Sequence, residues 1–280
     1  MLLEIKNLKK YFVQKDKGLV RAVDGVSLGV RQGESIGIVG ESGCGKTTLA
    51  KIIMGLTTPD QGSMLFEGQE VWGQRTREVL FRRRVRMVFQ DPYASLDPRF
   101  SVYSVLREAL CLEAKVAKGD EEIRMKGVLQ AVGLSGDILS RFPHEFSGGE
   151  RQRISIARAL MTDPSLLILD EAVSALDVLI QKEILDLLVS LQKTRSITEI
   201  FISHNLSAVR RVAQKIVVMY QGKIVEYGSV QDIFNDPRHS YTQRLLDAAI
   251  HYRVQGREDI VLKKEAVLLD IGQEHLVLSS

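Results

Sequence analysis

The stretch of sequence that decides the fold is Gly40-Glu41-Ser42-Gly43-Cys44-Gly45-Lys46-Thr47. It follows a short apolar run at residues 36–39, and after it apolar side chains recur with helical spacing at residues 49–56. A strand, a glycine-rich loop and a helix in this order form the setting in which backbone N–H groups and a helix N-terminus bind phosphate. We therefore predict an α/β fold in which this loop cradles the phosphates of a nucleotide.

Individual residues of the loop have distinct predicted roles. Lys46 is predicted to contact the β and γ phosphates of ATP, and the hydroxyl of Thr47, with Thr48 beside it, is predicted to bind Mg²⁺. Cys44 is interpreted as a small filler and not as a nucleophile, because no histidine partner is suggested nearby. The alternative, a glycine-rich turn that occurs by chance, is disfavoured by the strand and the helix on either side.

The composition is that of a soluble globular protein. The chain has 280 residues, of which 45% are hydrophobic and 26% are charged. Its formal net charge of +3 is too small to imply nucleic acid as a partner. Cys44 and Cys111 lie far apart and fit neither a disulfide framework nor a zinc site, which favours a reducing cytosol. No stretch approaches the roughly 18 apolar residues of a transmembrane helix, so we do not expect the chain to enter a membrane alone.

Short apolar runs along the chain have the character of parallel strands that are buried on both faces. They lie at residues 36–39, 85–89, 166–169, 200–202 and 216–219. Segments of helical periodicity separate them, the clearest at residues 180–191. Alternating strands and helices predict an α/β architecture. The alternation of apolar and polar residues at 26–30 predicts a β-rich N-terminal portion.

Residues 91 to about 162 break this rhythm, because they show helical patterns and no convincing strand between them. We predict a helical subdomain inserted there. Further on, Gln221-Gly222 predicts a turn between two strands, and Ser229 to Asp232 has the spacing of a helix capping box. A last helix is predicted at residues 240–250. Residues 1–250 are thus assigned to one domain, and residues 251–280 to a C-terminal extension of unassigned shape.

Two carboxylates follow the apolar run at residues 166–169. Asp170 is suited to hold Mg²⁺ through water, and Glu171 is suited to polarise an attacking water as a general base. An apolar run followed by Asp-Glu is a weak signal by itself. It becomes a strong one when it is paired with the phosphate loop earlier in the chain.

A second anion-binding segment is Phe146-Ser147-Gly148-Gly149-Glu150, which precedes another helical pattern. Ser147 and the two glycines therefore present a helix N-terminus suited to a negative group. A single ATP does not need two such cradles from one chain. The economical solution is a head-to-tail dimer, in which this segment of one copy closes over the γ-phosphate held by the loop of another.

In these motifs the sequence resembles the ATP-binding cassettes of ABC transporters, over about residues 2–250. Residues 40–47 resemble the Walker A motif, residues 166–170 Walker B, and residues 147–152 the signature motif. The resemblance implies an α/β P-loop NTPase cassette with an N-terminal antiparallel β portion and a helical subdomain inserted in a RecA-like core. It also implies a Q-loop at Gln90, a D-loop at residues 174–177, a switch histidine at His204 and an adenine-stacking ring at Tyr11.

The site residues that the resemblance implies fall into three groups. Catalytic roles are implied for Glu171, His204, Lys46 and Gln90. Nucleotide contacts are implied for Tyr11, for residues 40–48 and for the signature residues Ser147, Gly148, Gly149 and Glu150. Mg²⁺ ligands are implied at Thr47, Gln90 and Asp170. Each single residue has an ordinary alternative, such as a strand aromatic at Tyr11, a surface residue at Gln90 or a core histidine at His204, and their joint order disfavours these.

Within the family, Phe89-Gln90-Asp91-Pro92-Tyr93-Ala94-Ser95 and His239-Ser240-Tyr241-Thr242-Gln243 resemble importers of peptides and nickel. The resemblance implies an ATPase that powers such an importer at the cytoplasmic face of the cell membrane. Its implied partners are a second cassette, transmembrane permease subunits and, indirectly, a solute-binding protein. Phe146, Glu150 and Asn205 depart from the family pattern, and a negative Glu150 near a γ-phosphate is unfavourable unless it points away.

Two other functions stay open at this stage: an ABC ATPase of DNA repair or translation, and a weakly active regulatory cassette in a heterodimer. Six arginines lie between Arg75 and Arg86. We interpret them as a solvated helix face, because neither interleaved aromatics nor a nucleic-acid reader motif accompanies them. Contact with anionic lipid headgroups is a further alternative.

Overall fold

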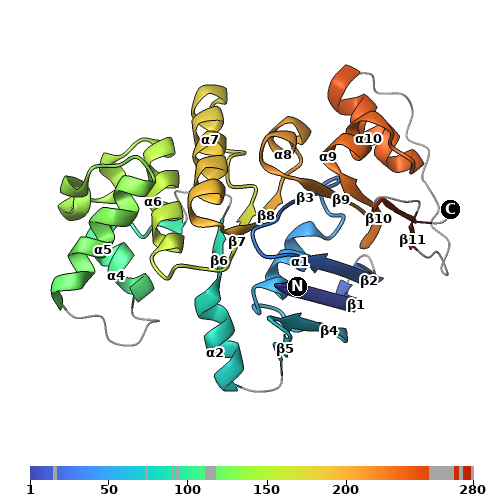
Figure 1. Cartoon of the computed structure of the whole chain (residues 1–280), viewed down its shortest axis with the longest axis horizontal. Coiled ribbons are helices and arrows are strands. Elements are labelled where there is room, and N and C mark those ends of the chain that lie inside the picture. Colours follow the sequence, from blue (N-terminus) through green and yellow to red (C-terminus); the bar gives the residue numbers. More distant parts are fainter. Residues whose placement is uncertain are drawn as a thin grey trace. The chain divides into compact units, whose positions relative to one another are not determined.

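The structure, a computed structural model, describes residues 1–14, 18–72, 75–89, 91, 95–110, 118–251, 268–270 and 274–278 (Figure 1). The chain folds into two compact units, residues 1–72 with residues 201–280, and residues 73–200. The division falls within strand β8 (Thr198–Ile202).

The first unit opens with an antiparallel sheet, which confirms the predicted N-terminal β portion. Strand β1 (Leu3–Gln14) lies between β2 (Gly18–Val30) and β4 (Gln61–Phe66), and β5 (Gln69–Glu70) pairs with β4. The alternating residues at 26–30 behave as predicted, because their apolar members are buried on one face of β2 while Ser27 is exposed.

The nucleotide-binding part of this unit begins with β3 (Ser35–Val39), which pairs in parallel with β9 (Lys215–Tyr220). The predicted turn then leads from β9 into the antiparallel strand β10 (Lys223–Ser229). Gln221 and Gly222 occupy it with φ values of 47° and 80°. Left-handed residues at both central positions give a hairpin turn whose twist matches that of the two strands.

Four helices and two short strands complete the description of this unit. The helices are α1 (Lys46–Ile53), α8 (Leu206–Val212), α9 (Val230–Asn235) and α10 (Ser240–His251). The predicted cap is present at α9, where the Ser229 side chain accepts the backbone N–H of Asp232. In the segment predicted to be a C-terminal extension, β12 (Leu276–Leu278) pairs with β10 and with β11 (Leu268–Asp270), strands that the sequence did not reveal.

The second unit pairs β6 (Val85–Val88) in parallel with β7 (Leu166–Asp170). Its other elements are helices: α2 (Arg75–Arg84), α4 (Val102–Leu110), α5 (Lys118–Ala131), α6 (Gly148–Leu160), α7 (Val178–Arg195) and the 3₁₀ turns η1 (Gly136–Ser140) and η2 (Pro143–Glu145). Figure 1 shows α4, α5 and α6 gathered together. Only helices occur among the described residues between 91 and 160, and the limits of the helical subdomain, about 91–162, stay a prediction.

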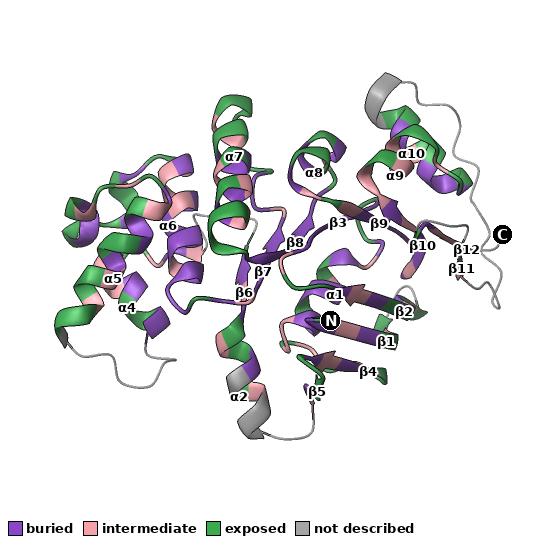
Figure 2. Cartoon of the chain, in the orientation of Figure 1, coloured by how far each residue is buried: buried purple, intermediate pink, exposed green. Residues whose placement is uncertain are grey.

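Burial follows the apolar runs. Every residue of β3, β7 and β8 is buried, as Figure 2 shows for these strands, which is typical of strands covered on both faces. Glu199 of β8 is a charged type of residue in such a place and is fully buried. None of the described helices has the length and apolarity needed to cross a membrane.

Candidate functional site

The predicted phosphate loop connects β3 to α1 and folds around Lys46. The Lys46 ammonium donates to the backbone carbonyl oxygens of Gly40, at 2.7 Å, and Glu41, at 2.8 Å, and its side chain is buried. Gly45 caps α1, so the lysine is the first residue of that helix. An anion held at this position would meet both the ammonium group and the positive end of the helix dipole.

Two glycines allow the loop to lie against neighbouring strands. Gly40 and Gly45 have φ values of 148° and 110°. A Cβ atom at Gly40 would lie 2.2 Å from the carbonyl oxygen of Met219 in β9, and one at Gly45 would lie 2.0 Å from that of Ala22 in β2. Any larger residue would therefore push the loop off its supports.

Cys44 lies beneath the loop, as expected of a filler. Its side chain is 6% exposed, and burial raises the pKa of its thiol, so the thiol is protonated at neutral pH. Its carbonyl oxygen accepts the backbone N–H of Gly222 at 2.9 Å. The residue thus ties the loop to the β9–β10 hairpin.

The rest of the loop faces outward. Glu41, Ser42, Gly43 and Thr47 are exposed, and Thr48 is half-buried. A Cβ atom at Gly43 would meet no other atom within 4 Å. This open rim is where a ligand could approach the backbone amides.

Tyr11 lies on β1 and is held at both ends. Its hydroxyl donates to Asp24 at 2.6 Å, and its backbone N–H donates to Asp60 at 2.7 Å. The Arg21 guanidinium lies 5.8 Å from the centroid of its ring. Burial and the bond to Asp24 raise the pKa of the Tyr11 hydroxyl. The ring is thus fixed within the first unit, and its stacking on adenine stays a prediction.

His204 is exposed, two residues after the end of β8, and belongs to the same unit as the phosphate loop. The preceding residue, Ser203, donates its backbone N–H to Ile38 of β3 at 3.2 Å, which places this segment beside the strand that leads into the loop. Asn205 follows as the N-cap of α8, and its side-chain oxygen accepts two backbone N–H groups of the first turn. The asparagine at this position thus has a local structural role.

Asp170 and Glu171 stand at the end of β7 in the second unit. The Asp170 side chain is 7% exposed, and Glu171 is half-buried. Glu171 adopts a left-handed conformation with φ 49°, which is uncommon for a residue other than glycine. Its carbonyl oxygen accepts the backbone N–H and the hydroxyl of Ser174. The strand therefore ends in a tight turn that redirects the chain at the predicted general base.

The signature segment begins α6, and Glu150 forms hydrogen bonds with the residue that caps this helix. Ser147 is the N-cap, and its hydroxyl oxygen accepts the Glu150 backbone N–H at 3.4 Å. The Glu150 carboxylate in turn accepts the Ser147 backbone N–H at 2.9 Å and the Ser147 hydroxyl at 2.7 Å. These bonds lower the pKa of Glu150. The carboxylate therefore lies at the helix N-terminus as half of a capping box.

The second glycine after Ser147 allows close packing. Gly148 begins α6, and a Cβ atom on Gly149 would lie only 2.4 Å from Cγ2 of Ile180 in α7. Phe146, which stands before the cap, is buried beneath the Arg141 guanidinium, 4.4 Å from its ring centroid. Gln90, a predicted catalytic residue and Mg²⁺ ligand, lies outside the described residues.

Comparisons with known proteins indicate the same family as these motifs. Residues 23–174 match the ABC transporter family. The oligopeptide transport ATP-binding protein OppF of Bacillus subtilis is 47% identical over 251 residues, which cover 88% of this chain and 82% of that protein. This chain belongs to the ABC transporter family. The dipeptide transport ATP-binding protein DppF of Escherichia coli is 42% identical over 265 residues, which cover 92% of this chain and 79% of that relative.

Solved ABC cassettes share the fold. The cbiO1 protein of Clostridium perfringens, part of an ABC transporter complex, has a TM-score of 0.75 and 28% identity, over 89% of this chain and 95% of that one. The cassette MJ0796 has a TM-score of 0.72 at 24% identity, over 81% of this chain and 98% of its own, and shows the fold alone. The predicted ABC ATPase cassette is thereby confirmed.

Proposed function

We propose that this ABC ATPase cassette powers an importer of oligopeptides or dipeptides. The support comes from relatives that share over two-fifths of their residues with it and are described as oligopeptide or dipeptide transport ATP-binding proteins. Such relatives favour transport over DNA repair or translation. Import of nickel, the other predicted cargo, receives no support from them. Attachment to permease subunits would place the protein at the cytoplasmic face of the cell membrane.

The observation that carries the mechanism is a pair of helix N-termini built for anions in one chain. One is the start of α1 with the buried Lys46, and the other is the start of α6, capped by Ser147. Each belongs to a different unit. We propose that ATP is bound between the phosphate loop of one cassette and the signature segment of a second one, arranged head to tail. The two cassettes then close only when ATP is bound, and ATP hydrolysis lets them separate.

The residues suit the chemistry of phosphoryl transfer to water. Lys46 would neutralise charge on the β and γ phosphates, Glu171 would take a proton from the attacking water, and His204 would contact the γ-phosphate. The Thr47 hydroxyl and the Asp170 carboxylate are the hard oxygen donors that Mg²⁺ prefers. Bound Mg²⁺ would neutralise phosphate charge.

A cavity of about 670 Å³ in the second unit suits a permease partner. It is lined by Ser95, Leu96, Asp97, Pro98, Arg99, Phe100, Val105, Glu108 and Arg158. Two of these residues are joined by a hydrogen bond, because Arg158 of α6 donates to the Ser95 carbonyl oxygen at 2.6 Å. Phe100 is exposed and contributes an apolar side chain to the lining. We propose that this groove receives a short helix of the membrane subunit.

The test is the variant Glu171→Gln. It keeps the shape of the side chain but removes the base, so it should bind ATP, turn over about 10²–10⁴-fold more slowly and accumulate as a dimer. Light scattering after gel filtration with ATP measures the dimer, and Lys46→Ala is the matched control that should stay monomeric. Undiminished hydrolysis by Glu171→Gln would refute the base assignment. ATPase measured separately at each composite site tests the remaining alternative, a regulatory cassette.

A further inference from the structure

Tyr241, at the start of α10, contacts the phosphate loop directly although the two are far apart in sequence. Its hydroxyl oxygen accepts the backbone N–H of Glu41 at 2.9 Å. The side chain is among the largest fully buried ones of the described chain, with 1% exposure. A buried hydroxyl that meets a loop amide in this way fixes the orientation of the peptide group to which the amide belongs.

That peptide group also bears one of the two carbonyl oxygens to which the Lys46 ammonium donates. The N–H of Glu41 and the C=O of Gly40 belong to one planar unit, and no peptide bond of the described chain is cis, so the two groups point in opposite directions. Tyr241 accepts from the N–H, and the Lys46 ammonium donates to the C=O at 2.7 Å. The tyrosine and the lysine therefore grip the same peptide group from opposite sides.

We propose that Tyr241 is a positioning residue for the phosphate loop: by holding the Gly40–Glu41 peptide group, it sets the place of the Lys46 ammonium for ATP. The proposal rests on the proposed role of residues 40–47 as the phosphate cradle. Tyr241 acts through the loop and is assigned no contact with the nucleotide.

The tyrosine ring itself is firmly held. It packs against the ring of Tyr220, with centroids 4.3 Å apart. Tyr220 is the last residue of β9, immediately before the hairpin turn in which Gly222 bonds to Cys44 of the loop. Burial raises the pKa of Tyr241, so its hydroxyl stays neutral at pH 7. The end of β9 thus packs against Tyr241 and leads into the turn that is bonded to the phosphate loop.

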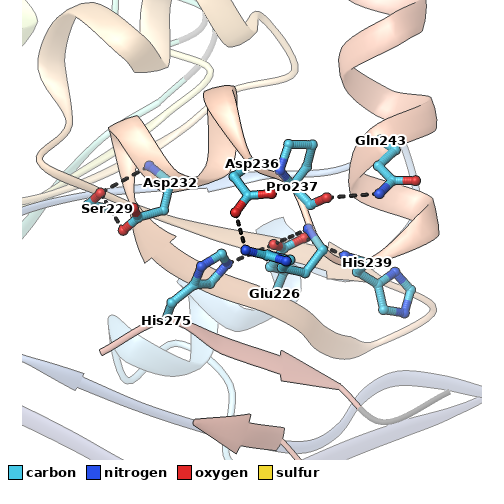
Figure 3. A network of polar contacts seen from close by, with 9 residues as sticks. Glu226, Ser229, Asp232, Asp236, Pro237, His239, Gln243 and His275 are labelled. Atoms are coloured by element: carbon cyan, nitrogen blue, oxygen red, sulfur yellow. Dashed lines mark hydrogen bonds and ion pairs between the residues drawn. The ribbon is translucent and has the colours of Figure 1, made fainter. Parts of the chain in front are cut away.

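The start of α10 is anchored by a buried carboxylate, as Figure 3 shows. Glu226 of β10 accepts the backbone N–H groups of Arg238 at 2.8 Å and His239 at 3.0 Å. The ring of His275, from the C-terminal extension, meets the same carboxylate at 2.7 Å. His239 accepts the backbone N–H of Tyr241 at 3.1 Å. The backbone at the start of α10, from which the Tyr241 side chain extends into the core, is therefore held in place by these hydrogen bonds.

The first experiment compares Tyr241→Phe with Tyr220→Phe. Both remove one hydroxyl from the same pair of packed rings, but the Tyr220 hydroxyl accepts only from the Gln221 side chain, at 3.3 Å, among the bonds described for it. ATP affinity is measured by calorimetry, and KM and kcat are measured in the assembled transporter. Tyr241→Phe is expected to weaken ATP binding about two- to tenfold, the effect of one lost neutral hydrogen bond, while Tyr220→Phe changes it little.

The second experiment tests whether the tyrosine acts through the lysine. The free energy of unfolding is measured for Tyr241→Phe, Lys46→Ala and the double variant, a cycle that needs no nucleotide. Because Tyr241 and Lys46 bind one peptide group, the effects of Tyr241→Phe and Lys46→Ala on the free energy of unfolding should be non-additive. The effects of Tyr220→Phe and Lys46→Ala should be additive. Additive effects for Tyr241→Phe, or an ATP affinity equal to that of Tyr220→Phe, would overturn the inference. If Lys46→Ala binds ATP as well as the parent protein does, the proposed phosphate cradle itself is wrong.

Discussion

Replacing Glu199 with glutamine should change how the stability of the protein depends on pH. Glu199 lies in β8, has no exposed surface, and neither carboxylate oxygen has a hydrogen-bond partner among the described residues. Burial penalises the charged carboxylate and raises its pKa to about 8. In the folded protein the side chain is therefore a neutral acid at pH 7.

The sign and size of the effect follow from proton binding. In the unfolded chain the pKa of this residue returns to its ordinary value of 4.5. Between pH 4.5 and about 8 the folded state holds one proton more than the unfolded state, so stability falls as the pH rises. Across the whole interval the loss amounts to about 5 kcal/mol as an upper figure. Below and above the interval both states carry the same charge at this residue, and its contribution is constant.

Denaturant titrations of both proteins, at pH values from about 5 to about 8, measure the effect. Glutamine cannot ionise, so the stability of Glu199→Gln relative to the parent protein should rise steadily with pH. The matched control is Glu183→Gln, the same change at an exposed position of α7, where the carboxylate forms a surface ion pair with Arg153. A stability difference that stays constant over this range would refute the reasoning, because it would mean that Glu199 ionises at its ordinary pKa.

Two further substitutions test packing and anchoring. Gly149→Ala should lower the free energy of unfolding by about 1–3 kcal/mol, because the new Cβ would lie 2.4 Å from Ile180. The second substitution Ile180→Ala in the same chain should restore part of this loss. If Gly149→Ala unfolds at the same temperature as the parent protein, the close contact is contradicted. Glu226→Gln leaves the backbone N–H of Arg238 or of His239 without an acceptor oxygen and should cost about 1–3 kcal/mol in denaturant titrations. The exposed control Glu274→Gln should cost less, and equal losses would argue against the anchor.

The sequence predicted the parts of this fold that depend on near neighbours. Strands β3, β7 and β9 are continuous apolar runs, and the glycine loop between a strand and a helix has few alternative conformations. The turn at Gln221-Gly222 and the cap at Ser229 were predictable for the same reason, since each depends on residues adjacent in the chain.

What the sequence did not reveal depends on distant partners. Strand β12 is only three residues long and exists through pairing with β10, in which Leu276 lies opposite Tyr227. Tyr241 and Glu41, which are in contact, lie 200 residues apart in the sequence, and no local sequence pattern predicts this contact. The left-handed turn at Glu171 is equally hidden. A local signal did exist for Glu150, because Ser-x-x-Glu is the spacing of a capping box.

Glu150 shows that a charge within a motif must be judged together with its local bonds. Judged only as a negative group near a phosphate, it would oppose binding through Coulomb repulsion. In the structure its carboxylate accepts the backbone N–H and the hydroxyl of Ser147, and a negative charge there is favoured by the dipole of α6. In the proposed dimer the Ser147 hydroxyl would exchange this carboxylate for the γ-phosphate of the partner cassette. A cap of this kind contributes only about 1 kcal/mol, so we expect Glu150 to weaken closure of the signature half-site in the proposed dimer without preventing hydrolysis.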